Sequence, residues 1–220
     1  MSVLKADRVS KFFGSFPALR DLTFALESGD CVALLGRNGA GKTTLLNLMA
    51  GLSRPTDGKL EITKRVSLLG HGIGVYDELS ARENLKFFAT LHTVAIDVDK
   101  WLYKVNLLNV ADAPLREYSR GMRQRLALAR VFMGDPELLL LDEPFTSLDD
   151  KATALLQTLL AEALARKATV VLSTHQIPEA MALASRIVFL ENGKLAYFGP
   201  RPQEMLDDST WIYRTYGASV

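Results

Sequence analysis

Apolar residues in this chain are gathered into short unbroken runs, with amphipathic stretches between them. Three of these runs, at residues 31–35, 138–141 and 169–173, predict buried strands. Strands of a parallel sheet are covered on both faces, so they read as continuous apolar segments. A helix is predicted over 42–52, directly after the first run. Strands that alternate with helices in this way indicate an α/β fold with a mainly parallel sheet.

The first part of the chain has a different pattern. Residues 3–26 alternate roughly between apolar and polar positions, with turn residues at 14–15 and 27–30. This pattern predicts two or three strands of an antiparallel sheet. A turn at 54–58 follows the first helix and leads into a predicted short hairpin that ends with 66–69.

The middle and the C-terminal part are predicted from helical spacing and turn residues. Residues 80–134 look mostly helical, with one helix opened by 81–88 and another by Ser119, a favourable N-cap. The remaining predicted elements are a helix over 151–166, a helix over 178–184, a hairpin over 187–198 around Asn192-Gly193, and a short final helix near Pro202.

The motif with the clearest chemistry follows the first buried strand. It fits the phosphate-loop pattern G-x-x-x-x-G-K-[ST] and reads Gly36-Arg37-Asn38-Gly39-Ala40-Gly41-Lys42-Thr43-Thr44. The glycines allow a tight turn whose N–H groups point at one anion, and the helix that follows adds its positive dipole end. We expect Lys42 to reach the β- and γ-phosphates of a nucleotide and the Thr43 hydroxyl to ligate Mg²⁺. A chance Gly-rich turn explains neither the strand before the motif nor the helix after it.

Two carboxylates follow the second buried run. Asp142 and Glu143 stand at its carboxyl end, which is where ligands bind in open α/β sheets. Asp142 is predicted to hold Mg²⁺, directly or through water, and Glu143 to polarise the attacking water as general base. An acidic turn after a core strand is the plain alternative, and the phosphate loop upstream favours the functional reading.

A second candidate anion-binding end lies at Ser119. The Ser119 hydroxyl, the backbone N–H of Gly121 and the dipole of the helix that follows could together bind a phosphate. An ordinary capped helix is the alternative at this position.

Taken together, these segments resemble the ATP-binding cassette ATPases, over nearly the whole chain. The resemblance makes the phosphate loop the Walker A motif, residues 138–142 the Walker B motif, and Ser119-Arg120-Gly121-Met122-Arg123 a variant of the family signature Ser-Gly-Gly-Gln. The other matching segments are Ser147-Leu148-Asp149 (the D-loop), His175 (the switch histidine) and Phe13 (the aromatic residue that stacks on adenine).

The resemblance implies one nucleotide-binding domain over residues 1–220. Its fold would be a P-loop NTPase (RecA-like) core with an antiparallel β subdomain and a helical signature subdomain at roughly 75–135. The implied activity is ATP hydrolysis with Mg²⁺ in a head-to-tail dimer, formed with an identical or a paired ATPase subunit. Each ATP would lie between the Walker A motif of one subunit and the signature (Ser119, Gly121) of the other. His175 would contact the γ-phosphate and orient the water, and Asp149 would help to couple the two sites.

The implied membrane partners are transmembrane permease subunits, which would dock on the helical region. The chain has no run of about eighteen apolar residues, and Lys5, Asp7 and Arg8 interrupt any signal-peptide layout. We therefore expect a cytoplasmic protein that is peripheral on the inner face of the cell membrane and reaches the membrane only through its partner. The single cysteine, Cys31, is expected to be a small core hydrophobe.

The charge balance bears on the alternatives. With 26 Lys and Arg against 25 Asp and Glu, the chain offers no broad electrostatic surface for nucleic acid. Soluble cassette ATPases that act on nucleic acid or ribosomes usually carry two cassettes or a long coiled-coil insertion, and this chain has neither. A P-loop kinase or GTPase would leave the signature at Ser119 and the position of His175 unexplained.

One branch of the family resembles this chain in segments outside the general motifs. Gly51–Pro55, Gly70-His71 and the run 76–87 are similar to segments of the ATPase of the cytochrome c maturation system, often called a haem exporter. Export ATPases in general share Glu83-Asn84-Leu85, so a drug, lipid or polysaccharide exporter is the alternative reading.

His71 is the main departure from the family pattern. The family usually has a glutamine at this strand end, which contacts Mg²⁺ and links the two subdomains. Imidazole is a poorer ligand for Mg²⁺ than an amide oxygen, so we expect His71 to act through water or to transmit position. A slip in the alignment, which would leave this role without a residue, is the alternative.

The variant His71→Gln tests this departure. If His71 is a degenerate glutamine, the isolated protein should keep or increase its ATPase activity, measured as steady-state phosphate release. A collapse of that activity would show that the histidine has chemistry of its own.

Overall fold

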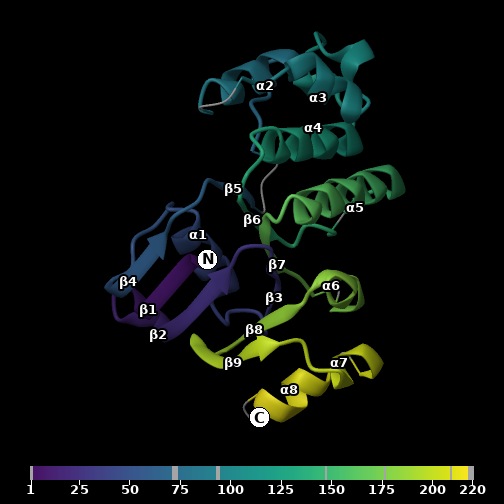
Figure 1. Cartoon of the computed structure of the whole chain (residues 1–220). Coiled ribbons are helices and arrows are strands. Elements are labelled where there is room, and N and C mark those ends of the chain that lie inside the picture. Colours follow the sequence, from purple (N-terminus) through teal and green to yellow (C-terminus); the bar gives the residue numbers. More distant parts are fainter. Residues whose placement is uncertain are drawn as a thin grey trace.

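A six-stranded sheet runs through the centre of the protein (Figure 1). The computed structural model describes residues 2–70, 74–92, 95–146, 148–175, 177–208 and 210–217. The strands are β3 (Cys31–Leu35), β5 (Val66–Leu69), β6 (Leu138–Asp142), β7 (Thr169–Ser173), β8 (Arg186–Glu191) and β9 (Lys194–Pro200). Their order is β5-β6-β7-β3-β8-β9, with β9 antiparallel at one edge and the others parallel. Every residue of β3, β6 and β7 is buried, which confirms the strands predicted from the continuous apolar runs.

A smaller antiparallel sheet packs beside the large one. It contains β1 (Ser2–Phe13), β2 (Phe16–Glu27) and β4 (Asp57–Ile62) in the order β2-β1-β4. The alternating N-terminal segment therefore forms two long strands, and β4 is the third strand of this sheet. The turn of the β8–β9 hairpin reaches the small sheet, because the Arg20 N–H donates to the Gly193 carbonyl over 2.8 Å.

The prediction of a hairpin that ends at residues 66–69 is wrong. The two short strands of this segment belong to different sheets: β4 pairs with β1, whereas β5 pairs in parallel with β6. Two short strands joined by a few polar residues look like a hairpin in sequence. Their actual partners are supplied by distant parts of the chain, which no local pattern reveals.

Helices cover both faces of the large sheet (Figure 1). The helices of the described residues are α1 (Lys42–Met49), α2 (Ala81–Ala89), α3 (Val98–Lys104), α4 (Arg120–Phe132), α5 (Asp150–Ala165), α6 (Ile177–Leu183), α7 (Glu204–Asp207) and α8 (Trp211–Tyr216), with short 3₁₀ turns η1 (Leu108–Val110) and η2 (Leu115–Glu117). Helix α1 is shorter than predicted, because Gly51 adopts φ +72° just beyond it. The C-terminal segment forms two short helices where one was predicted.

The two faces of the sheet belong to two separate hydrophobic cores. Cys31, Ala33 and Leu35 of β3 face the core that contains α4, α5 and α8. Val32 and Leu34 face the core that contains α1 and the small sheet. This is the period-two alternation of a strand buried on both sides. Burial raises the pKa of the Cys31 thiol to about 12, so this cysteine packs as a neutral side chain.

Helices α2, α3 and α4 form a layer at one end of the molecule (Figure 1). They share a third core, to which they contribute Leu85, Leu102 and Leu126. Helix α2 begins with a capping box, in which the Ser80 and Glu83 side chains each accept a hydrogen bond from the other residue's backbone N–H. Within the described residues, no helix is both long and apolar enough to cross a lipid bilayer.

Asn84 forms hydrogen bonds with the loop that leads into this helical layer. Its side chain is fully buried and accepts from the Tyr76 N–H over 2.8 Å. The amide of Asn84 donates to the carbonyls of Tyr76, at 3.0 Å, and of Ser80, at 2.9 Å. The asparagine of the Glu83-Asn84-Leu85 motif therefore satisfies the backbone of the loop before α2.

The variant Asn84→Ala should lower the free energy of unfolding by about 2–4 kcal/mol, because it leaves several buried or partly buried backbone groups without their side-chain partner. Denaturant unfolding followed by circular dichroism measures this loss. The exposed Lys86 of the same helix is the control: Lys86→Ala should stay within about 0.5 kcal/mol of wild type. Equal stability of the two variants would contradict the structural role of Asn84.

Candidate nucleotide-binding site

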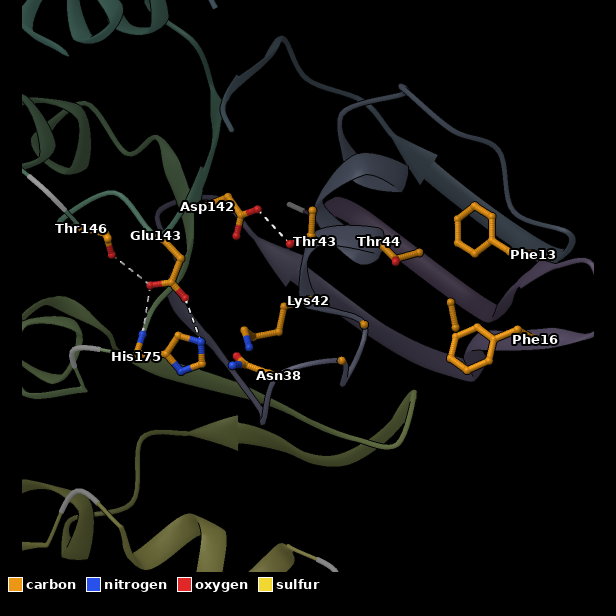
Figure 2. Close-up of a pocket in the computed structure, with 13 residues that line it drawn as sticks. Phe13, Phe16, Asn38, Lys42, Thr43, Thr44, Asp142, Glu143, Thr146 and His175 are labelled. Carbon is orange, nitrogen blue, oxygen red and sulfur yellow. Dashed lines mark hydrogen bonds and ion pairs between the residues drawn. The ribbon is translucent and has the colours of Figure 1, made fainter. Parts of the chain in front are cut away.

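The carboxyl ends of β3, β6 and β7 open onto one cavity of about 800 Å³ (Figure 2). Most residues of the phosphate loop line it, together with the carboxylates after β6 and the histidine after β7. The lining residues are Phe13, Phe16, Ala18, Asn38, Gly39, Gly41, Lys42, Thr43, Thr44, Asp142, Glu143, Thr146 and His175. Gly36, Arg37 and Ala40 complete the loop without lining the cavity. The described part of the site thus brings together segments that are far apart in the sequence.

Lys42 lies across the phosphate loop. Its Nζ donates to the carbonyl oxygens of Gly36, at 2.8 Å, and Arg37, at 3.3 Å. Burial lowers the pKa of Lys42, while the nearby carboxylates of Glu143 and Asp142 act in the opposite direction and favour the charged form. Lys42 Nζ is thereby held against the phosphate loop, at the cavity that Asp142 and Glu143 also line.

Asp142 and Thr43 are joined across the sheet. The Thr43 hydroxyl donates to Asp142 Oδ2 over 2.9 Å (Figure 2), and the Ser173 hydroxyl donates to Asp142 Oδ1. Asp142 is buried with only 5% of its surface exposed. A hydroxyl and a carboxylate oxygen at this separation are a donor set that suits a hard divalent cation such as Mg²⁺.

Glu143 is held firmly at the edge of the cavity. Its backbone adopts φ 53°, and its N–H donates to the Ser173 carbonyl over 3.0 Å. The carboxylate contacts His175 twice: Oε1 lies 3.2 Å from His175 Nε2, and Oε2 accepts from the His175 N–H at 3.2 Å. Thr146 adds a hydroxyl at 3.4 Å from Oε2 (Figure 2). The side chain of Glu143 is only 13% exposed, so its position is well defined.

The other end of the cavity is aromatic. Phe13 and Phe16 flank it with 57% and 63% of their surfaces exposed (Figure 2), and Lys11 Nζ lies 5.3 Å from the Phe13 ring centroid. Sequence reasoning identified Phe13 but missed Phe16, Ala18 and Thr146. The signal for Phe16 was an aromatic residue directly after the Gly14-Ser15 turn that follows Phe13, whereas Thr146 gave no such signal.

Ser119, Gly121 and Asp149 do not line this cavity. Ser119 caps α4, and its hydroxyl accepts from the Met122 N–H at 3.2 Å. Asp149 caps α5 through the Ala152 N–H at 2.7 Å. A Cβ on Gly121 would lie 2.3 Å from Asp149 Oδ2, so the signature and the D-loop are in direct contact. His71 and Ser147 lie outside the described residues.

The sequence model of the ABC transporter family matches residues 19–146, more than half of the chain. This chain belongs to the ABC transporter family. It is an ATP-binding subunit of that family and an ATP hydrolase, and its fold is the P-loop NTPase α/β fold that the motifs predicted.

Several curated relatives cover most of the chain. It is 40% identical over 190 residues to the cytochrome c biogenesis ATP-binding export protein CcmA 2 of Cupriavidus metallidurans, covering 80% of this chain and 90% of the relative. It is 36% identical to the Nod factor export ATP-binding protein I of Rhizobium meliloti, covering 91% of this chain and 64% of that protein. The sulfate/thiosulfate import ATP-binding protein CysA of Synechococcus elongatus is also 36% identical, with 93% and 64% covered. Importers and exporters therefore both occur among the relatives.

Solved structures agree with this assignment. The structure of an ATP-binding subunit of an ABC transporter superposes with a TM-score of 0.84 at 27% identity, covering 99% of this chain and 95% of that one. A dimeric ATP-binding cassette in a post-hydrolysis state with ADP and Pi has a TM-score of 0.79 at 24% identity, covering 90% and 99%, and shows the shared fold.

Proposed function

We propose that this protein hydrolyses ATP in the cavity of Figure 2, with Glu143 as the general base. The observation that carries this proposal is the placement of Glu143. Its carboxylate stands at the carboxyl edge of the sheet, in the same cavity as Lys42 and the phosphate loop. A base in that position can take a proton from a water molecule that attacks the terminal phosphate.

The phosphate loop would bind the nucleotide. Its N–H groups and the start of α1 favour the negative charge of the phosphates, and Lys42 Nζ would exchange its carbonyl partners for the β- and γ-phosphate oxygens. Phe13 would stack on adenine at the aromatic end of the cavity, with Phe16 beside it.

Thr43 and Asp142 would hold Mg²⁺ through the two oxygens that now lie 2.9 Å apart. The ion would neutralise the charge that develops on the phosphate oxygens. The Ser173 hydroxyl keeps the Asp142 carboxylate turned toward this position.

His175 would orient the attacking water together with Glu143. Both its backbone N–H and its Nε2 already contact the Glu143 carboxylate, which fixes the direction in which that carboxylate points. With the imidazole half exposed, His175 can turn toward a bound γ-phosphate.

A second subunit would complete each site. Ser119 and Gly121 form a helix N-terminus that lies outside the cavity of their own chain, so they are free to serve the nucleotide of a partner. The contact between Gly121 and Asp149 would link the signature to the D-loop and couple the two sites. The partner would be an identical chain or a paired ATPase subunit in a head-to-tail dimer.

Transmembrane permease subunits would dock between the helical layer and the sheet. A groove of about 620 Å³ lies there, and its rim carries Leu52 and Leu91 with 71% and 68% of their surfaces exposed. Exposed leucines on a groove are typical of an interaction surface. The helical layer, within the region 75–135, would then act as the subdomain that carries the docking face. The protein would lie in the cytoplasm, peripheral on the inner face of the membrane, and would reach the membrane only through this partner.

The most specific similarities support export as the direction of transport. They also support the cytochrome c maturation branch of the family. The export protein CcmA 2 is 40% identical to this chain, and the Gly70-His71 and 76–87 segments resemble that branch. The similarity to a sulfate importer is the reason for testing the partner directly.

The variant Glu143→Gln should bind ATP but hydrolyse it at least about 100-fold more slowly, because general-base catalysis is lost. Phosphate release measures the rate, and gel filtration with ATP should show accumulation of a dimer. Glu179→Gln, which changes an exposed carboxylate on α6, is the matched control and should turn over ATP normally. Wild-type turnover in Glu143→Gln would remove Glu143 as the base.

A tagged pull-down from detergent-solubilised membranes of the native organism tests the transport role. Recovery of small multi-span subunits together with cytochrome c assembly proteins is the expected result. Recovery of an unrelated permease would be consistent with export and would contradict the assignment to the cytochrome c branch. The reproducible absence of a membrane partner would contradict the transporter assignment and favour a soluble ATPase.

A further inference from the structure

The hairpin that joins β1 to β2 presents two aromatic side chains on one face. Phe13 and Phe16 are directly opposite each other in the register of the two strands, across the turn of Gly14 and Ser15. Directly opposite residues of an antiparallel pair project from the same face of the sheet. Both side chains line the cavity, and Figure 2 shows their rings at the end away from Glu143. Phe13 and Phe16 therefore form a cross-strand aromatic pair at this end.

Hydrogen bonds fix the end of this hairpin to the turn after α1. Lys11 Nζ donates to the Arg54 carbonyl over 2.8 Å, and the Phe12 N–H donates to the Thr56 hydroxyl over 3.1 Å. Lys11 Nζ also lies over the Phe13 ring, 5.3 Å from its centroid. The lysine covers one face of that ring, which leaves the opposite face for a stacked base. The aromatic pair is thus carried by a hairpin whose position is well defined.

Ala18 connects the aromatic pair to the phosphate loop. It lies two residues after Phe16 on the same face of β2, which is about 7 Å along a strand. Ala18 is buried and lines the cavity, and its carbonyl oxygen would lie 2.7 Å from a Cβ on Gly41 of the loop. A ribose fills the interval between the phosphates and the base of a nucleotide. A nucleotide whose phosphates bind at the loop therefore brings its base to Phe16.

The small sheet contributes an apolar wall to the cavity. Among the described lining residues, those from β1 and β2 are Phe13, Phe16 and Ala18. The Phe16 ring is largely exposed to solvent, and it gains free energy when another flat apolar surface covers it. Every base has a π-face, so stacking on such a ring tolerates different bases. Stacking is therefore the interaction that the side chains of this wall offer to a base.

We propose that Phe16 is a second base-binding residue, which contacts the nucleobase from β2 while Phe13 contacts it from β1. The inference rests on the proposed nucleotide site and adds a residue to its base-binding end. Stacking acts on the base alone, so the contribution of Phe16 falls on the affinity for a nucleotide and leaves the affinity for its phosphates unchanged. Adenine and guanine nucleotides should gain similarly, because both purines offer a large flat surface.

The variant Phe16→Ala tests the inference, because it removes the ring and keeps the backbone of the hairpin. The Kd for Mg²⁺-ADP, measured by isothermal titration calorimetry, should rise about five- to thirtyfold, the range for one lost stacking contact. The Kd for Mg²⁺-GDP should rise by a similar factor. The Kd for Mg²⁺-pyrophosphate, a probe without a base, should stay within about twofold, because the phosphate contacts are independent of the ring. Phe16→Tyr keeps an aromatic ring and should retain the wild-type Kd for ADP.

Phe12→Ala is the matched control. Phe12 is also an exposed phenylalanine of β1, but successive side chains of a strand point to opposite faces, and Phe12 does not line the cavity. This variant should keep the wild-type Kd for ADP. Wild-type ADP affinity in Phe16→Ala would overturn the inference. Equal losses of ADP and pyrophosphate affinity would also overturn it, because Phe16 would then only support the fold of the site.

Phe13→Ala separates the inference from the site on which it rests. Weaker ADP binding in both Phe13→Ala and Phe16→Ala, with unchanged pyrophosphate binding, is the expected result. Weaker ADP binding in Phe13→Ala alone would reject Phe16 and leave the proposed site intact. Wild-type ADP binding in both variants would contradict the base-binding end of the proposed site, and the role of Phe16 would fall with it.

Discussion

The nucleotide site depends on the parallel pairing of β6, β7 and β3. Asp142 is in register with Ser173, and Ser173 with Leu34 of the strand before the phosphate loop. This register lets the Ser173 hydroxyl and carbonyl hold Asp142 and Glu143 in place, and it lets Asp142 reach Thr43. A slip of one residue would move the carboxylate by about 3.3 Å and turn it to the other face of the sheet.

Both ends of the site are built around backbone conformations that most residues avoid. Gly41 adopts φ +102°, and a Cβ there would lie 2.7 Å from the Ala18 carbonyl oxygen of the small sheet. Glu143 adopts the left-handed conformation with a full side chain, at a cost of about 1–2 kcal/mol. Such strain is typical of functional positions, where the surrounding hydrogen bonds must hold the residue in place. At Glu143 those bonds come from Ser173, His175 and Thr146.

Much of the fold and of the site could be predicted from local pattern. The strands predicted at 31–35, 138–141 and 169–173, the hairpin at Asn192-Gly193 and helix α5 followed from apolar runs, turn residues and helical spacing. The phosphate loop and the two carboxylates were visible because their chemistry depends on residue type and on position after a strand. The hairpin before residue 69 was predicted wrongly, because its strands pair with β1 and β6 and not with each other.

The sequence by itself determined the family, the ATP-binding role and the order of the elements, because these depend on short motifs and local periodicity. Only the tertiary structure decided which distant residues meet. It placed Phe16 and Thr146 in the cavity and joined Gly121 to Asp149. These contacts arise from sheet order and helix packing, which bring together segments that have no relation in sequence.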